Sequence, residues 1–245
     1  NLFFGRWEAP LPVSPSCNAR CLGCLSLQDS DCTTASHSRI KFVPTPNEIA
    51  EVAVSHLKGA REAIVSFGQG CEGEPLLQFK TLKESVIRIR KLTSRGTVHL
   101  NTNACKPTYL KELANAGLDS VRISINSFRE DYYNAYYRPK KYSLKDVLDS
   151  IKIASDAGLF VSLNLLVFPG LTDTPTEVNR LIKLLRKKRV NLLQMRNLCI
   201  DSEFYLNNIP RIKERPMGVM NMLNLIKKSI PKVRFGYFNL PKERF

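Results

Sequence analysis

Three cysteines stand within eight residues near the start of the chain, with the spacing Cys17-x3-Cys21-x2-Cys24. Thiolates gathered this closely can bind one metal centre, and the loop itself contains no fourth cysteine. A [4Fe–4S] cluster with three thiolate ligands keeps one iron open, and an open iron can bind a small molecule through amino and carboxylate groups. The spacing therefore favours an iron–sulfur loop with one free coordination position.

Two other interpretations of this loop stay open at the level of spacing. Zinc prefers four ligands, and Cys32 or His37 could supply the fourth. The three residues could also be unrelated buried cysteines. The chain has seven cysteines, an odd number that argues against a fully paired set of disulfides. We therefore expect a protein of a reducing compartment, in the cytoplasm.

A second group of distinctive residues lies in the sequence GQGCEGEPLL, residues 68–77, after the next strand-like segment. Within it, Gly73 would let the backbone approach a ligand closely, and Glu74 and backbone carbonyls suit an ammonium group. Further polar residues stand at or beyond the ends of later strand-like segments: Thr102, Asn103, Ser124, Asn126, Arg138 and Asn164. Each also has a simpler interpretation as a residue of a turn, a strand end, a helix start or the surface.

The segments that must position these residues alternate between strand-like and helix-like patterns. Short apolar runs typical of buried parallel strands cover residues 63–67, 97–101, 120–125, 160–167, 190–196 and 233–238. Amphipathic stretches cover residues 46–58, 79–92, 107–116, 143–157, 174–188 and 216–229. This alternation predicts an α/β protein with one parallel sheet, either curled into a full or partial barrel or open and doubly wound. In both, the ligand site lies at the carboxyl ends of the strands, where the distinctive residues fall.

The order of these motifs resembles the radical SAM superfamily, whose signature loop is C-x3-C-x2-C. Residues 72–75 (EGEP) are similar to the glycine–glutamate motif after the family's second strand. Residues 100–103 (LNTN), 121–126 (VRISIN), 137–139 (YRP) and 164–170 (NLLVFPG) resemble later segments in the same order, most closely those of the molybdenum-cofactor and peptide-modifying branches. The resemblance extends over residues 12–196. Two positions depart from it: Gly23 stands where the family often has an aromatic residue, and Ala104 where it has the glycine of T-N-G.

The resemblance implies a partial (β/α)6 TIM-like barrel with parallel strands, acting as a radical SAM enzyme. It implies that Cys17, Cys21 and Cys24 bind a [4Fe–4S] cluster whose fourth iron binds S-adenosylmethionine (SAM). The residues that it places around SAM are Gly73, Glu74, Thr102, Asn103, Ser124, Asn126, Arg138 and Asn164. One electron, delivered by a donor such as ferredoxin or flavodoxin, would cleave SAM to a 5′-deoxyadenosyl radical, which would abstract a hydrogen from the substrate.

Three scattered cysteines are candidate catalytic residues. Cys71 lies inside the second motif, and Cys105 and Cys199 follow predicted strand ends. Each could donate a hydrogen, accept a bond from the substrate or bind another cluster. Each could equally be an ordinary free cysteine.

The charge of the chain bears on its substrate. A net charge of +15, from 37 Lys and Arg against 22 Asp and Glu, makes RNA or an anionic small molecule conceivable, and the family likeness adds a peptide. The alternative function is a non-catalytic, zinc-stabilised basic module that binds RNA, which leaves residues 72–75 and 101–104 unexplained. No stretch approaches the roughly 18 uncharged apolar residues of a membrane helix, so we expect no membrane contact.

We expect the chain to comprise three parts: an N-terminal segment with the cluster loop (residues 1–41), the barrel core (42–215), and a C-terminal helix and strand that close the barrel (216–245). Residues 7–12 (WEAPLP) resemble a segment in a group of bacterial radical SAM proteins with no assigned reaction. Because the first residue is Asn1 rather than Met, we also expect a further region before it.

Overall fold

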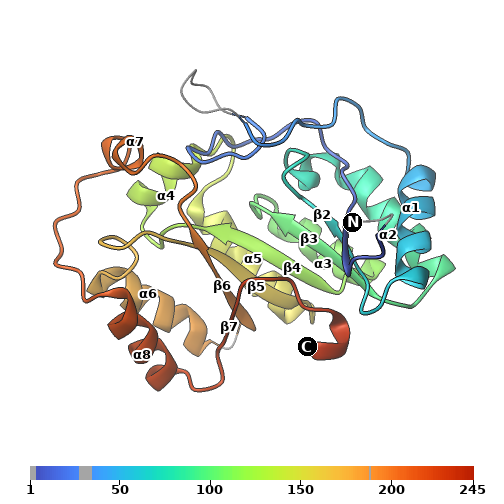
Figure 1. The fold of residues 1–245 in the computed structure, drawn as a ribbon. Coiled ribbons are helices and arrows are strands. Elements are labelled where there is room, and N and C mark those ends of the chain that lie inside the picture. Colours follow the sequence, from blue (N-terminus) through green and yellow to red (C-terminus); the bar gives the residue numbers. More distant parts are fainter. Residues whose placement is uncertain (1–3, 28–34, 188) are drawn as a thin grey trace.

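The structure is a computed structural model that describes residues 4–27, 35–187 and 189–245. Seven strands form one sheet in chain order: β1 (Glu8–Pro10), β2 (Ile64–Phe67), β3 (Thr97–Thr102), β4 (Ser120–Ile125), β5 (Phe160–Val167), β6 (Leu192–Asn197) and β7 (Arg234–Gly236). Every neighbouring pair is parallel. β1 and β7 are the two edges and do not pair with each other, so the barrel is partial (Figure 1).

Helices connect the strands. They are α1 (Pro46–Gly59), α2 (Phe79–Leu92), α3 (Pro107–Ala116), α4 (Glu130–Tyr137), α5 (Leu144–Asp156), α6 (Pro175–Arg186), α7 (Ser202–Asn207) and α8 (Val219–Ser229), with 3-10 turns at Pro75–Gln78 and Lys242–Arg244. α1 starts at a reciprocal cap, in which Thr45 N–H donates to the Glu48 carboxylate at 2.8 Å and Glu48 N–H donates to the Thr45 hydroxyl at 3.3 Å. Within the described ranges, no helix is both long and apolar enough to cross a lipid bilayer.

The predicted α/β alternation is confirmed, since β2 to β7 fall on the six strand-like segments. The structure adds β1, α4 and α7, which the sequence pattern does not indicate. β1 has only three residues and contains Pro10, which an edge strand tolerates. α4 buries four tyrosines instead of an aliphatic stripe. α8 begins at Val219 rather than at residue 216, because Gly218 precedes it with a positive φ of 88° that a helix does not allow.

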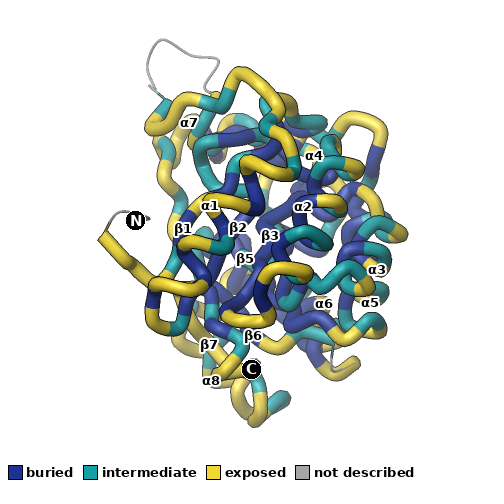
Figure 2. Tube along the Cα trace, turned by 90° about the vertical axis from the view of Figure 1, so that its right-hand side faces the viewer, coloured by how far each residue is buried: buried dark blue, intermediate teal, exposed yellow. Residues whose placement is uncertain are grey.

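The core lies between the sheet and the helices on its outer face (Figure 2). β2 and β3 are buried at every position, as expected for central parallel strands. Helices α1, α2, α3 and α5 pack side by side and bury Leu57, Leu82, Leu110 and Ile151. This packed shell fixes the strand ends, and with them the residues that the strands carry toward the site.

The C-terminal tail bridges the open seam of the barrel. Asn239 donates its side-chain N–H to the Glu8 carboxylate of β1 at 2.8 Å, and its oxygen accepts from the Gln194 amide of β6 at 3.0 Å. One side chain thus joins the first strand to the sixth, although no strand pairing does so.

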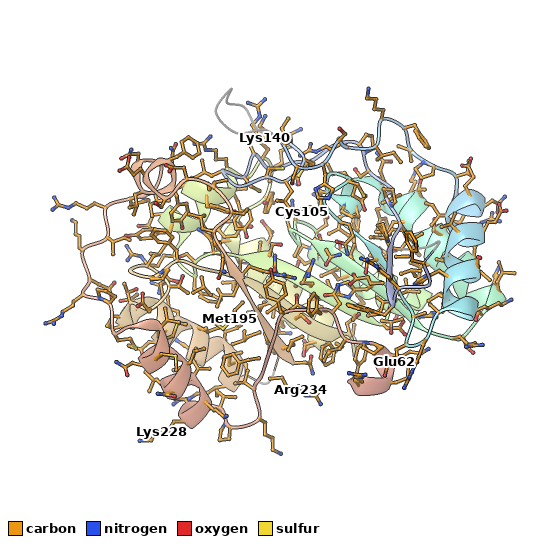
Figure 3. The ribbon with its side chains drawn as sticks, in the orientation of Figure 1. Glu62, Cys105, Lys140, Met195, Lys228 and Arg234 are labelled. Atoms are coloured by element: carbon orange, nitrogen blue, oxygen red, sulfur yellow. The ribbon has the colours of Figure 1, made fainter. Side chains whose placement is uncertain are left out.

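The same tail lies across the amino-terminal end of the barrel. Lys242 N–H donates to the hydroxyl of Thr97, the first residue of β3, at 2.7 Å. Arg244 pairs with Glu62, which precedes β2, at 2.7 Å. Figure 3 shows Glu62 at this end of the molecule and Lys140 at the opposite end, where the cysteine loop lies.

Candidate cluster and cofactor site

The cysteine loop lies against the C-terminal end of α4. Arg20 N–H donates to the Tyr137 carbonyl oxygen at 3.0 Å, and Lys140 N–H donates to the Asn18 carbonyl oxygen at 2.8 Å. These bonds join backbone to backbone. They therefore hold the course of the loop that carries all three thiols, whatever its side chains bind.

Glu72 ties the segment before this loop to the turn after β2. Its carboxylate is buried and accepts the N–H groups of Val13 at 2.8 Å, Ser14 at 2.9 Å and Gly68. Burial raises the pKa of Glu72 to about 7, against the lowering effect of these three donors. Glu72 is a site residue that the sequence reasoning missed, because its partners are backbone groups of a remote segment.

Gly73 allows two backbones to approach closely. A Cβ at Gly73 would lie 2.0 Å from the Ser16 carbonyl oxygen, a distance that no side chain tolerates. At this contact Gly73 N–H donates to the Ser14 carbonyl oxygen at 2.7 Å, and Glu74 N–H donates to that of Ser16 at 2.8 Å. The glycine of the second motif is therefore required by packing against the residue that precedes Cys17.

Glu74 joins the turns after β2 and β3. Its buried carboxylate accepts the Thr102 hydroxyl at 2.5 Å and Asn103 N–H at 2.7 Å. Burial raises the pKa of Glu74 to about 7. The Asn103 amide in turn donates to the Asn18 side chain of the cysteine loop at 2.7 Å. The predicted residues of the two turns thus meet beside the cysteines, with the Glu74 carboxylate already occupied.

The three thiols influence one another electrostatically. Burial raises the pKa of Cys17 to about 11, with smaller increases from the charges of Glu74 and Cys24, and burial also raises the pKa of Cys21, with increases from Cys17 and Cys24. For Cys24, hydrogen bonds from Ser26 and Arg39 outweigh the effect of burial and lower the pKa. Arg39 Nη2 lies 3.4 Å from the Cys24 sulfur, so a charged donor faces one of the three predicted cluster ligands. Arg39 is a second residue that sequence reasoning missed.

The three thiols of the loop match the number of cysteine ligands that leave one iron of a [4Fe–4S] cluster open. Among the described residues, no group of three His, Cys, Asp or Glu side chains is close enough to hold one metal ion. A [4Fe–4S] cluster does not need such a group, because each thiolate binds a different iron. Of the two suggested fourth ligands for zinc, His37 is exposed and contacts the Ser36 hydroxyl at 3.1 Å, and Cys32 lies outside the described residues.

The predicted residues of the later strands take separate positions. Ser124 of β4 and Asn164 of β5 face the interior of the barrel, where the Asn164 amide lies 3.4 Å from the Ser124 hydroxyl. Asn126 is buried and donates to the Tyr132 carbonyl oxygen at 3.1 Å. Arg138 is exposed at the end of α4 and donates to Asn208 at 2.8 Å. As contacts of SAM these four stay predictions.

The three candidate catalytic cysteines differ in exposure. Cys71 is half-buried and lines a cavity of about 550 Å³ together with Trp7, His37 and Phe238. Cys105 is buried near the carboxyl end of β3 (Figure 3), where burial and the Glu74 charge raise its pKa to about 12. Cys199 is exposed.

The departure at Gly23 has a structural counterpart in Tyr136 of α4. A Cβ at Gly23 would lie 2.8 Å from the Tyr136 hydroxyl oxygen. Leu22 N–H also donates to the Tyr136 carbonyl oxygen at 3.0 Å. An aromatic side chain therefore stands beside Gly23, although it comes from a helix more than a hundred residues later in the chain.

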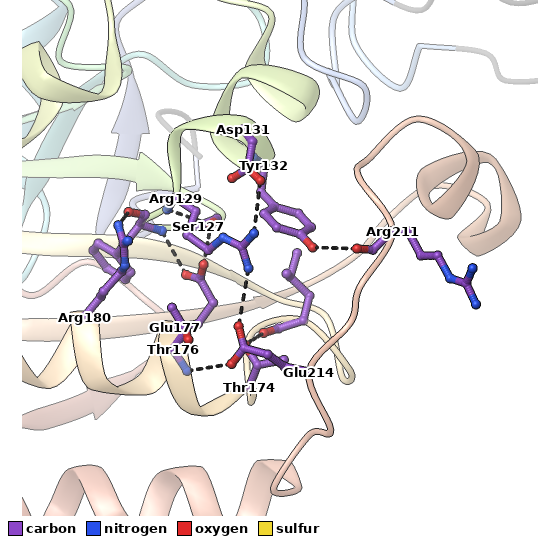
Figure 4. A network of polar contacts seen from close by, with 12 residues as sticks. Ser127, Arg129, Asp131, Tyr132, Thr174, Thr176, Glu177, Arg180, Arg211 and Glu214 are labelled. Atoms are coloured by element: carbon purple, nitrogen blue, oxygen red, sulfur yellow. Dashed lines mark hydrogen bonds and ion pairs between the residues drawn. The ribbon is translucent and has the colours of Figure 1, made fainter.

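A polar network holds α4 in place under the loop (Figure 4). Arg129, just before α4, pairs with Asp131 at 3.1 Å and with Glu214 at 3.4 Å. Glu177 of α6 accepts the Ser127 hydroxyl at 2.7 Å and Phe128 N–H at 2.9 Å. The turn that leads into α4 is thus anchored both to α6 and to the segment between α7 and α8.

Comparison with known proteins decides the family. Residues 11–190 match the sequence profile of the radical SAM superfamily, well over half of the chain. The chain belongs to the radical SAM superfamily. Its cofactors are accordingly a [4Fe–4S] cluster and SAM, which agrees with the set of three thiols and not with a zinc-stabilised RNA-binding module. Radical SAM proteins are enzymes, so the predicted class is confirmed.

Two relatives and one solved structure show what this radical SAM protein is similar to. A GTP 3′,8-cyclase of Marinobacter nauticus is 30% identical over 183 residues, 74% of this chain and 51% of its own. An uncharacterised protein of Methanocaldococcus jannaschii is 25% identical over 226 residues, 87% of this chain and 77% of its own. The crystal structure of Streptococcus suis SuiB has the same fold, with a TM-score of 0.65 and 13% identity over 95% of this chain and 49% of its own. The chain spans about half the length of this cyclase and of SuiB.

Proposed function

We propose that this protein cleaves SAM reductively and uses the product to remove a hydrogen atom from a substrate inside the barrel. The observation that carries the proposal is the docking of the Cys17–Cys24 loop and the segment before it onto the turns after β2 and β3: Glu72 holds Ser14, and Asn103 holds Asn18. When bound, the cluster and SAM supply one electron and a 5′-deoxyadenosyl radical, and the protein orients the reactants and excludes water.

Within this proposal each residue has a stated part. Cys17, Cys21 and Cys24 bind three irons, and the fourth iron is left to SAM. Because the Glu74 carboxylate is occupied by Thr102 and Asn103, we assign Glu74 to shaping the turn beside SAM. The residues that we place around SAM are Gly73, Glu74, Thr102, Asn103, Ser124, Asn126, Arg138 and Asn164.

Of the scattered cysteines, Cys105 best suits chemistry on the substrate radical. It is buried, and its N–H donates to the Asn103 side chain at 3.0 Å, which in turn donates to Asn18 of the cysteine loop, so this thiol lies beside the turns that we place around SAM. Burial raises the pKa of Cys71, but this thiol lies on the cavity near β1. Cys199 is exposed, so we rank it last.

The partner that supplies the electron is proposed from charge. A net charge of +15 complements a small acidic one-electron carrier such as ferredoxin or flavodoxin. No disulfide joins the cysteines of the described residues, and thiols together with an iron–sulfur cluster suit a reducing compartment. We therefore place the protein in the cytoplasm. The substrate classes are an anionic small molecule, for which the GTP of the cyclase relative is one example, a peptide or RNA.

The experiment is anaerobic reconstitution with iron and sulfide, followed by dithionite and SAM, with 5′-deoxyadenosine as the measured product. We expect product from the wild type and none from Cys21→Ala, because two remaining thiolates do not retain the cluster. Cys199→Ala is the matched control, since it removes an exposed thiol outside the loop, and we expect it to retain SAM cleavage, which is measured without a substrate and so does not involve a role of Cys199 on the substrate. Equal product from Cys21→Ala and the wild type overturns the proposal.

A further inference from the structure

An arginine enters the interior of the barrel from β4. Along this strand Val121, Ile123 and Ile125 are buried against the helices, and Arg122 and Ser124 alternate with them. Because side chains of a strand point to opposite faces in turn, Arg122 faces the same interior as Ser124. There Arg122 Nη1 donates to the Gln194 side chain of β6 at 3.0 Å.

The guanidinium of Arg122 is not fully satisfied. Its Nε atom is inaccessible to solvent and has no hydrogen-bond partner in the part of the chain that the structure describes. Within the same ranges no carboxylate oxygen lies within 4.0 Å of it. A buried donor without an acceptor is costly, and a buried charge without a counter-charge is more so.

Glu8 is the acidic group whose charge acts on Arg122, and it is already engaged. Its Oε1 atom accepts the Ser66 hydroxyl, the Gln69 amide at 2.8 Å and the Asn239 amide at 2.8 Å. These three donors are neutral, so they hold the carboxylate in place without cancelling its charge. Glu8 therefore acts on Arg122 at a distance, with its Oε1 atom held by these three donors.

A second guanidinium faces the same space. Arg196 of β6 donates from Nε to the Asn164 side chain at 3.2 Å and stacks on the Tyr237 ring, with its carbon 3.8 Å from the ring centre. Burial and the charge of Arg196 together lower the pKa of Arg122 to about 10. In the described residues Arg196 also forms no ion pair. Among the described residues, the charges that act on Arg122 are thus one further guanidinium, Arg196, and one carboxylate, Glu8.

We propose that Arg122 and Arg196 form an anion subsite inside the barrel, which binds a carboxylate or phosphate group of the substrate. An oxyanion bound between the two guanidiniums offsets the repulsion between their charges. Asn164, Gln194 and the Tyr237 ring orient the pair and do not neutralise it. That the anion belongs to the hydrogen-donating substrate rests on the proposed function, whereas the existence of the subsite does not.

The test is a binding titration of the full chain, reconstituted anaerobically and labelled with 15N-arginine. The probes are inorganic pyrophosphate and succinate, which separate a phosphate from a carboxylate. Calorimetry gives the dissociation constant. NMR of the Nε–H groups of Arg122 and Arg196 reports where the probe binds, and the two resonances are assigned by their loss in the Arg122→Lys and Arg196→Lys variants. We expect one probe to bind saturably and to move both resonances.

Substitutions of the two arginines test whether the probe binds at them. Arg122→Gln and Arg196→Gln each weaken binding at least about tenfold, because each removes a charge-assisted hydrogen bond. Arg95→Gln, at an exposed arginine before β3, leaves the dissociation constant unchanged. If Arg122→Gln does not fold, the dissociation constant of Arg196→Gln and the shifts of the two wild-type resonances test the subsite instead. No saturable binding of either probe, or wild-type binding by both variants, overturns the subsite.

The two proposals fail separately. If the wild-type protein binds an anion at these arginines but makes no 5′-deoxyadenosine, the subsite is supported and the proposed function is overturned. If the wild-type protein cleaves SAM but binds neither probe, the proposed function is supported and the subsite is overturned.

Discussion

Glu72 Oε2 accepts the N–H group of Ser14 at 2.9 Å, so a buried carboxylate after β2 holds the backbone three residues before Cys17. The other oxygen of Glu72 accepts Gly68 N–H at the end of the same strand. One side chain therefore sets the position of the cysteine loop relative to the sheet. The second motif of the sequence acts in this structure as the support of the first.

Gly73→Ala should disrupt this support. Its Cβ would meet the Ser16 carbonyl oxygen at 2.0 Å, and the backbone of the loop has to move away. We expect the free energy of unfolding to fall on the order of 3 kcal/mol and the iron content after reconstitution to fall with it. Gly59→Ala is the control, because no atom lies within 4 Å of its Cβ position. Equal iron content in the two variants would contradict the role of Gly73 in positioning the cysteine loop.

Arg39→Gln should make the cluster harder to reduce. Arg39 Nη2 points at the Cys24 sulfur from 3.4 Å, and positive charge and N–H donors at a ligand sulfur favour the reduced cluster. We expect a more negative midpoint potential in an anaerobic EPR titration, with iron content unchanged. Arg95→Gln, far from the loop at the start of β3, serves as the control. An unaltered potential in Arg39→Gln would contradict this role.

Ala104→Gly should be tolerated or stabilising. Ala104 is buried after β3 with φ of 58°, a left-handed conformation that disfavours any side chain with a Cβ. We expect the free energy of unfolding in urea to rise by up to about 1 kcal/mol. Ala154→Gly, inside α5, should lower it by about 1 kcal/mol. Similar losses in both variants would mean that the φ angle carries no strain.

His99 should make the protein less stable in acid. Burial, with the charge of Arg122, lowers the pKa of His99 to about 3, whereas the unfolded chain takes up this proton near 6.5. The free energy of unfolding therefore falls as pH drops from 6.5 toward 3, by at most about 1.4 kcal/mol per pH unit. His99→Gln removes this part of the pH dependence, and His37→Gln, at an exposed site, does not. A wild-type slope in His99→Gln would refute the assignment.

The features that the sequence predicted best are the strands and helices, because these follow from the periodicity of apolar residues. β4 and β5 have the bounds that their apolar runs indicate, and Ser124 and Asn164 meet because parallel strands in register carry their ends to one edge. Glu72 was missed because its partner Ser14 is a backbone group 58 residues away, and no spacing encodes such a bond. Arg122 gave no signal either, since an arginine in a strand says nothing about the other strands that enclose it.

The most direct test of the whole account is the EPR spectrum of the reduced, reconstituted protein with and without SAM. We expect a four-iron signal that changes when SAM is added, is retained in Cys199→Ala and is lost in Cys21→Ala. This result would show that the three thiols hold a cluster with an iron open to SAM. A colourless protein with about one zinc per chain and no iron signal would contradict the account.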